Sequence, residues 1–423
     1  MNKGLLLGID FTESCCRACY FNEKHAVVEN VIEPAGSGGL LIPSVLCYDN
    51  EKKQWLIGEA AENYACETGA YLYTGLLTNT LAQESCAFEG RTMPYSSLFS
   101  IFFAGLTDLA RRCSGVSPIA CVNITLRRIN LEIKEVLENA FARIGLGREK
   151  LHFLSYPESF AYFIIQQDES LWLEGADLFD FSDDGFFLNR LTLSREREKS
   201  TIFVSEQNYS LEFSAKDLRN IVLRPGIDER LNSLYDEIKG QAGKTSVYFT
   251  GSGFEELWFS NTLKNISQTR RAFRGNNIYA KGACLEGLLR KEETLDKFTV
   301  VCRHKTKASI SVEARYKGSA QTTVLLPAAE NWYETGCSAD FILDDAQTMD
   351  FIVTSLLSKE KTHIAFDLSS FPARPPKTTR VRVIIKYLNE YECEICVRDL
   401  GFGGLYPGSG LEVRKILNLE GYI

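Results

Sequence analysis

Three carboxylates in this sequence follow apolar runs and are candidates to hold a divalent cation. Asp10 ends the run GLLLGID, and Asp183 and Asp184 follow the run ADLFDFS. Carboxylate oxygens are the ligands that hard cations such as Mg²⁺ prefer. Asp10 and Asp183 are therefore predicted metal ligands. Alternatively, Asp183 and Asp184 only form a solvated turn.

A Gly-Ser-Gly segment made of Gly251, Ser252 and Gly253 is a second candidate site. It follows the apolar run SVYFT and precedes the helical pattern FEELWFSNTLKN, so it lies between a strand and a helix. Glycine allows backbone N–H groups to approach a ligand closely. The segment either contacts a nucleoside or only makes a tight strand-to-helix turn, and the second interpretation is favoured.

Two cysteine pairs have the spacing of metal ligands, Cys16 with Cys19 and Cys393 with Cys396. Both pairs lie in runs that predict strands, CCRACYF and YECEICV. Residues three apart on a strand point to opposite faces, so neither pair forms one chelate. The thirteen cysteines are interpreted as reduced, mostly buried thiols that pack as small apolar side chains.

The elements that must position these residues alternate between strands and helices in the first part of the chain. Apolar spacing predicts helices over residues 96–113, 130–145 and 276–291. Residues 214–239 are also predicted to be helical, with a break near Pro225. Short apolar runs between the helices, such as IACVNITL, predict buried strands. This alternation predicts a mixed α/β architecture of two related lobes.

The pattern changes near a short polar segment, residues 291–297. From Leu295 onward, alternating runs such as ASISVEARY and RVRVIIKYL follow one another, separated by turn residues. Such a series is typical of an all-β sandwich. The predicted domains are therefore residues 1–292, which are α/β, and residues 293–423, which are all β.

The composition excludes some broad classes of function. The 423 residues carry a formal net charge of −8, which argues against a general nucleic-acid or membrane surface. No apolar run nears the roughly 18 residues that a membrane span needs. The apolar stretch at the N-terminus is too short for the core of a signal peptide. We therefore expect a cytoplasmic protein that neither binds nucleic acid nor inserts into a membrane.

The segment that carries the most specific resemblance is FDLSSFPARPPKTTRVRVIIKYLNEYECEICVRDLGFG. Its proline cluster, alternating strand and closing Arg-Asp strand resemble the end of the peptide-binding β-sandwich of DnaK-type heat-shock-70 chaperones. The N-terminal part is similar to the same family in order. LLLGIDFTESC resembles its first phosphate loop, FDFSDDGFF its second, and VYFTGSG its adenosine loop.

This resemblance implies a fold and a set of nucleotide contacts. The implied fold is a two-lobed actin-like ATPase fold with ribonuclease-H-like lobes, followed by an all-β sandwich that resembles the DnaK peptide-binding domain. The implied contacts with ATP or ADP and Mg²⁺ come from the three loops of the lobes. They are Asp10, Thr12 and Glu13 in the first loop, Asp180 and Gly185 in the second, and Gly251, Ser252 and Gly253 in the third.

The sequence departs from the family inside the two phosphate loops. Thr12 stands where the family has a glycine, and Glu13 stands where it has a threonine. In the second loop the glycines are replaced by Ser182, Asp183 and Asp184. Carboxylates are therefore expected where triphosphate oxygens would lie, and each such contact costs on the order of a few kcal/mol in a partly buried site.

The residues that would hydrolyse ATP are also replaced. The family's phosphate-side lysine has no counterpart, because no lysine occurs from Gln54 to Ile133. The family's catalytic glutamate aligns with Tyr156, although Glu158 lies only two residues away. Phosphoryl transfer depends on positioned cations and dipoles. We therefore expect an inactive ATPase without a cofactor, with ATP or ADP and Mg²⁺ as ligands only if the site keeps residual activity.

The β-domain carries the predicted peptide contacts. The resemblance places them at Phe341 and Ile352, or at Phe351 and Val353 if the strand register slips by one. Asp350 stands at a pocket position, where it would weaken an apolar pocket. The chain ends at Ile423, so we expect no helical lid.

Three functions follow from these expectations. The preferred one is a chaperone-like or scaffold-like protein that binds a partner protein or an extended peptide and has lost its ATPase activity. The alternatives are a slow, divergent DnaK-like ATPase and an actin-like assembly component.

Overall fold

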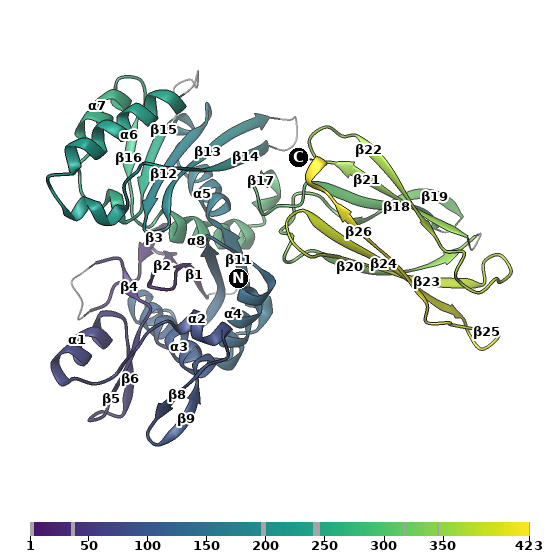
Figure 1. Cartoon of the computed structure of the whole chain (residues 1–423), viewed down its shortest axis with the longest axis horizontal. Helices are drawn as coiled ribbons and strands as arrows, with labels where there is room; N and C mark the ends of the chain where they lie inside the picture. The colour runs from purple at the N-terminus through teal and green to yellow at the C-terminus, as the bar shows by residue number, and fades with distance from the viewer. Residues whose placement is uncertain are drawn as a thin grey trace. The chain divides into compact units, whose positions relative to one another are not determined.

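A computed structural model describes residues 4–34, 39–195, 200–239, 246–316, 318–344 and 347–422 (Figure 1). The chain divides into two compact units, Met1–Cys302 and Arg303–Ile423. The expected boundary after residue 292 is ten residues too early. Strand β17 (Phe298–Val301) pairs in parallel with β14 (Ser200–Tyr209), so it completes a sheet of the first unit.

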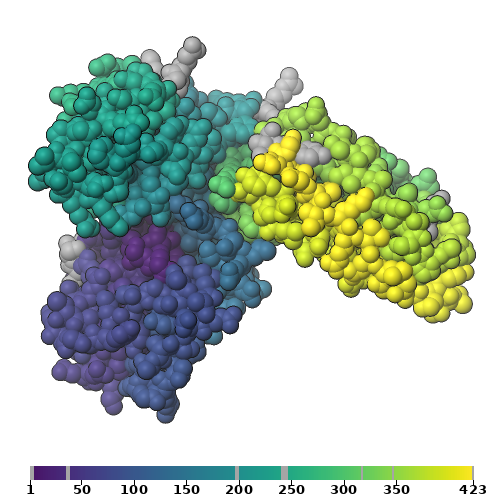
Figure 2. All heavy atoms as spheres, in the orientation of Figure 1, coloured from purple at the N-terminus to yellow at the C-terminus, as the bar shows by residue number. Residues whose placement is uncertain are grey.

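The first unit is mixed α/β, as its alternating pattern predicts, and its two lobes appear in Figure 2 as an upper teal mass in contact with a lower purple-to-blue mass. The sheet of the first lobe contains β1, whose seven residues LLLGIDF are all buried. Gly8 lets β1 approach a helix closely, because a Cβ there would lie 2.2 Å from the Ala280 carbonyl oxygen. In spatial order this sheet is β11 (Leu151–Ser155), β10 (Ile119–Leu126), β1 (Leu5–Phe11), β2 (Cys15–Asn22) and β3 (Val27–Asn30), with β4 (Ile42–Pro43) beside β2.

The sheet of the second lobe is built on β12, which contributes two phenylalanines to an aromatic core. Phe179 and Phe181 pack there with Phe249, Phe254 and Tyr235. In spatial order the strands are β16 (Ala272–Arg274), β15 (Ser246–Thr250), β12 (Ala176–Ser182), β13 (Gly185–Arg195), β14 and β17.

The helices of the first unit lie close to where the apolar spacing predicts them. Helix α4 (Leu131–Arg143) follows the N-cap residue Asn130, whose side chain accepts a hydrogen bond from the backbone N–H of Ile133 at 2.7 Å. The predicted break near Pro225 separates the 3₁₀ turn η3 (Ala215–Arg219) from helix α6 (Arg224–Ile238). The other helices are α1 (Gly58–Thr68), α2 (Leu76–Leu81), α3 (Tyr95–Ser114), α4 (Leu131–Arg143), α5 (Tyr156–Ile165), α7 (Ser260–Ser267) and α8 (Ile278–Lys291), with the 3₁₀ turns η1 (Arg148–Lys150), η2 (Glu169–Leu171), η4 (Ser252–Phe254) and η5 (Leu295–Lys297).

Small β elements complete the first lobe. A three-stranded sheet has the order β6 (Gln54–Ile57), β5 (Leu46–Asp49) and β7 (Leu72–Tyr73), and β8 (Ser85–Phe88) forms a hairpin with β9 (Arg91–Pro94). Every helix in the described part of the chain is too short or too polar to cross a bilayer.

The second unit is β-rich, as its alternating runs predict, and holds two antiparallel sheets. One has the order β19 (Ser319–Leu326), β18 (Ala308–Tyr316), β21 (Thr348–Ser355) and β22 (Lys361–Asp367). The other has the order β20 (Gly336–Leu343), β23 (Thr379–Tyr387), β24 (Glu392–Phe402) and β25 (Tyr406–Pro407), with β26 (Glu412–Asn418) also beside β24 and the 3₁₀ turn η6 (Glu420–Tyr422) after it.

Both cysteine pairs with metal-like spacing lie on strands, as predicted. Cys16 and Cys19 belong to β2, and Cys393 and Cys396 belong to β24. All four side chains are buried.

Candidate functional site

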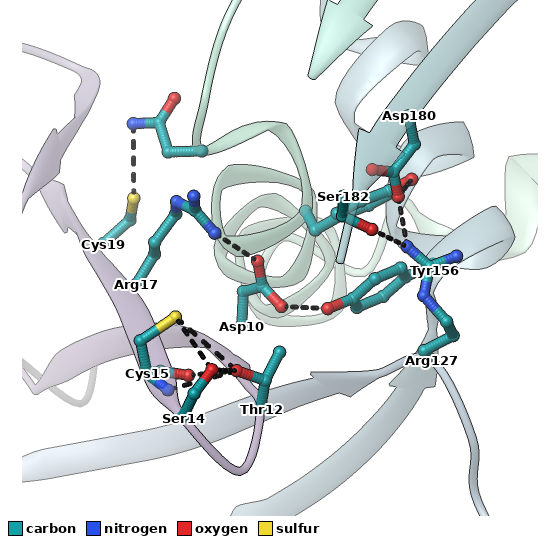
Figure 3. Close-up of polar contacts among 12 residues, drawn as sticks. Asp10, Thr12, Ser14, Cys15, Arg17, Cys19, Arg127, Tyr156, Asp180 and Ser182 are labelled. Atoms are coloured by element: carbon teal, nitrogen blue, oxygen red, sulfur yellow. Dashed lines mark hydrogen bonds and ion pairs between the residues drawn. The ribbon is translucent and has the colours of Figure 1, made fainter. Parts of the chain in front are cut away.

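Turns from both lobes of the first unit enclose a cavity of about 320 Å³ (Figure 3). The β1–β2 turn and the end of β10 come from the first lobe, and the β12–β13 turn and the end of β15 come from the second. The predicted residues that line the cavity are Asp10, Thr12, Glu13, Asp180, Asp183, Gly251 and Ser252. Gly253 instead lines a neighbouring hollow, and Gly185 lines neither.

Asp10 lies at the centre of this site and is 3% exposed. One carboxylate oxygen accepts a hydrogen bond from the Tyr156 hydroxyl at 2.6 Å, and the other lies 3.7 Å from Arg17 Nη1 (Figure 3). Burial raises the pKa of Asp10, and the nearby Arg17 guanidinium opposes this increase. The carboxylate is therefore already bound by donors of the protein itself.

Arg127 joins the two lobes and was missed by the sequence analysis. It directly follows β10 of the first lobe and makes an ion pair with Asp180 of the second lobe. Its Nε donates to Asp184 at 3.1 Å. The guanidinium carbon lies 4.0 Å from the centre of the Phe187 ring and 4.7 Å from that of Tyr156. Burial alone would lower the pKa of Arg127, but the negative Asp180 raises it, so the guanidinium stays charged.

Two stacked tyrosines, Tyr156 and Tyr279, line the cavity. The rings of Tyr156 and Tyr279 are 3.9 Å apart and inclined by 15°. The Tyr279 hydroxyl donates to Asp180 at 3.0 Å. Both hydroxyls are buried beside carboxylates, which raises the pKa of each phenol and keeps it protonated as a donor.

The structure also decides between Tyr156 and Glu158 as the residue that faces the cavity. Helix α5 begins at Tyr156, after the N-cap residue Ser155. Tyr156 lines the cavity, whereas Glu158 is buried at 2% exposure and does not line it. A phenol, which is a poor base at neutral pH, therefore stands at the first turn of this helix.

The Glu13 carboxylate lines the cavity and is also held by helix α2. Its carboxylate accepts hydrogen bonds from the backbone N–H of Thr78 at 3.0 Å and from the Thr78 hydroxyl at 2.9 Å. It thus binds the first turn of α2, where free N–H groups attract an anion. Thr12 is also engaged locally, because its hydroxyl donates to the Cys15 carbonyl at 2.7 Å.

The predicted metal ligands Asp10 and Asp183 both line the cavity, and each contacts other side chains of the protein. Asp183 and Asp184 form a two-residue turn, because Ser182 pairs directly with Gly185. The Asp183 side chain is 62% exposed and lies 3.9 Å from Lys216, while Asp10 binds Tyr156 and Arg17. Among the residues that the structure describes, no three His, Cys, Asp or Glu side chains gather as a metal site requires.

The glycines of the third loop are explained by packing. Gly251 has φ of +95°, and a Cβ there would lie 2.3 Å from the Phe181 carbonyl oxygen. A Cβ on Gly253 would lie 2.5 Å from the Phe181 ring. Both glycines therefore fit the tight strand-to-helix turn against β12 that the sequence analysis favours.

The predicted peptide contacts lie on different sheets of the second unit. Phe341 is half-buried on β20, which is at the edge of its sheet. Ile352 lies on β21 and is only 5% exposed. The alternatives Phe351 and Val353 are fully buried core residues. A peptide would therefore reach Phe341 more easily than any of the three residues on β21.

Arg17, Arg127 and Tyr279 are the site residues that the sequence analysis missed. In this region the family resemblance points only to a lysine, which the sequence lacks from Gln54 to Ile133. An arginine directly after the buried run IACVNITL was the available signal, because parallel strands end at the same edge of a sheet.

Comparison with known proteins identifies two regions. A model described as "Family of unknown function (DUF5716) C-terminal" matches residues 28–303, and one described as "Domain of unknown function (DUF8552)" matches residues 305–419. A search of curated proteins gives no match. The two matched regions meet near the observed division after Cys302.

Proposed function

The chain belongs to the family described as "Family of unknown function (DUF5716) C-terminal", and we propose that it is a chaperone-like or scaffold-like binding protein whose nucleotide site has become structural. Its proposed ancestry is the DnaK type, with an actin-like two-lobed body and a peptide-binding β-sandwich. The binding partner is a protein or an extended peptide, held by the β-domain.

The observation that carries this proposal is that the carboxylates of Asp10 and Asp180 are already bound by side chains of the protein itself. Asp10 binds Tyr156 and Arg17, and Asp180 binds Arg127 and Tyr279. A nucleotide with its metal would have to break these contacts before it could bind the same carboxylates. Leaving a buried polar group without a partner costs about 1–3 kcal/mol, and more for a charged group.

The electrostatics of the cavity also oppose a triphosphate. Its lining contains five carboxylates, Asp10, Glu13, Asp180, Asp183 and Asp184, against the two guanidinium groups of Arg17 and Arg127. Phosphate sites normally present glycine N–H groups and cations instead. The cavity volume of about 320 Å³ is at the lower end of the range of roughly 300–1,000 Å³ for ligand pockets.

Thermal unfolding with and without nucleotide tests the first half of the proposal. We expect millimolar ATP or ADP with Mg²⁺ to leave the unfolding temperature of the first unit unchanged. A ligand at 100 times its dissociation constant would stabilise the unit by about 2.7 kcal/mol. A clear shift that disappears in Asp10→Asn would overturn the loss of nucleotide binding and favour the slow ATPase, whose turnover would then be measured directly.

A permanently unfolded protein tests the second half. Reduced, carboxymethylated lactalbumin labelled with a fluorophore is the probe, and fluorescence anisotropy is the readout. Chaperone-like binding is expected to weaken in Phe341→Asp but not in Ile416→Asp, a 59% exposed position on another edge strand of the same unit. Wild-type protein that does not bind the probe would exclude the chaperone-like form and leave the scaffold-like form.

A further inference from the structure

Three consecutive aliphatic residues project from the second lobe, outside the site described above. Ile221, Val222 and Leu223 lie between η3 and α6 and are 71%, 83% and 37% exposed. Leu257, which follows η4, is 66% exposed. We call these four residues the aliphatic prominence. Contiguous exposed apolar side chains of this kind mark interaction surfaces more often than single ones do.

The prominence is held in place by specific contacts. Arg224 Nη1 lies 2.6 Å from Glu256 Oε2, which joins the turn of Val222 to the turn of Leu257. Arg224 Nε also donates to the Leu218 carbonyl at 2.8 Å, and the backbone N–H of Val222 donates to Asn220 at 3.1 Å. A preformed turn loses little conformational entropy on association.

A hollow of about 290 Å³ lies directly beside the prominence, and Arg219, Arg224 and Glu256 belong to its lining. The charged residues of this lining are balanced, although the whole chain carries a net charge of −8. Three are cations and three are carboxylates: Lys216, Arg219 and Arg224 against Asp183, Glu255 and Glu256.

We propose that this face binds a second copy of the same chain as a twofold symmetric dimer. A twofold interface brings one patch against itself, so the patch must supply both partners of each contact. This patch supplies an apolar projection beside a hollow, and equal numbers of opposite charges. An apolar centre with a polar rim is the usual arrangement of a protein interface.

The balanced charges around the hollow argue against an anionic membrane and against a partner of one charge sign. An anionic membrane attracts surfaces with an excess of lysine and arginine, and this rim has none. An acidic or a basic partner would select a rim of one sign. The inference does not depend on the proposed function, because a dimer can form whether or not the cavity binds nucleotide.

Sedimentation velocity of the full chain over a range of concentrations tests the dimer. We expect wild-type protein to form a dimer and Val222→Asp to weaken its association about 100-fold. Each dimer contains two Val222 side chains, and each lost contact of about 1.4 kcal/mol is a factor of ten. Leu405→Asp is the matched control, since Leu405 is an 89% exposed aliphatic residue of the second unit.

Three results would overturn the proposal. The first is a wild-type chain that stays monomeric at every concentration, and the second is a dimer that persists in both Val222→Asp and Leu257→Asp. The third is loss of the dimer in Leu405→Asp alone, which would place the interface elsewhere. Circular dichroism of each variant separates dissociation from misfolding, and Arg219→Glu, which alters only the rim, provides a variant that keeps the apolar turn.

Discussion

Removal of the Arg127 guanidinium should destabilise the first unit strongly. Methionine at this position keeps an unbranched side chain of similar length but no charge. Arg127→Met leaves Asp180, whose side chain is 2% exposed, with the Tyr279 hydroxyl as its remaining donor among the contacts described above. It also removes the guanidinium from between the rings of Tyr156 and Phe187.

The expected loss in the free energy of unfolding follows from the burial of the Arg127–Asp180 ion pair. Breaking a buried ion pair by removing one partner costs about 3–5 kcal/mol, because the other charge stays behind in a poorly solvating place. Loss of the cation–ring contacts adds about 0.5–2 kcal/mol. The Arg127 side chain is 11% exposed, so water relieves part of this cost, and we expect a loss of about 4 kcal/mol.

Urea unfolding followed by tryptophan fluorescence measures this loss, since Trp55, Trp172 and Trp258 lie in the first unit. Arg128→Met is the matched control. The Arg128 side chain is exposed, and a change there should cost at most about 0.5 kcal/mol. The double variant Arg127→Met with Asp180→Asn removes both charges and should recover most of the lost stability.

The reasoning would be refuted if Arg127→Met unfolded within about 1 kcal/mol of wild type. It would also be refuted if the double variant were as unstable as the sum of the two single variants, because the two side chains would then contribute independently.

Three further predictions concern single positions. Arg374→Met should destabilise the second unit by about 3–5 kcal/mol in urea unfolding, because Arg374 makes two hydrogen bonds, at 2.6 and 2.8 Å, to the buried Asp399; an unchanged midpoint would contradict this. Gly251→Ala should cost about 1–3 kcal/mol from its positive φ alone, whereas Gly404→Ala, with open space around its Cα, should be neutral in the same melt. Burial lowers the pKa of His304 to about 4, so between pH 6.5 and 4 the unfolded chain binds a proton that the folded chain does not. The free energy of unfolding should therefore fall by up to about 3 kcal/mol as the pH drops from about 6.5 towards 4. His304→Gln should flatten this pH dependence, and a wild-type free energy of unfolding that is equal at both pH values would contradict the prediction.

The sequence by itself determined the local elements and the loops that meet at the site. Apolar periodicity located α3, α4 and α8 to within a few residues, because burial of one helix face requires that spacing. Asp10 closes the apolar run GLLLGI near the end of β1, whereas Asp180 lies inside β12 and was located only by the resemblance of FDFSDDGFF to a phosphate loop. The glycines of the third loop were interpreted as a tight turn, and Gly251 has the positive φ that fits such a turn.

Only the tertiary structure decided what binds those carboxylates. Arg127 is separated from Asp180 by 53 positions, and Tyr156 from Asp10 by 146, so no local pattern links either pair. The parallel alignment of β1, β10 and β11 brings Asp10, Arg127 and Tyr156 to one edge of a sheet. The second lobe then adds Asp180, and Tyr279 comes from helix α8, which packs against β1 and β10.

For Glu13 too, the sequence did not reveal which groups the side chain would contact. From the sequence it was a carboxylate in a phosphate loop, yet in the fold its nearest donors belong to α2. The observed division after Cys302 differs from the expected boundary for a related reason, because the β14–β17 pairing spans about 100 residues and appears in no local run. Residue type and spacing define the available donors and acceptors, and long-range packing determines which of them meet.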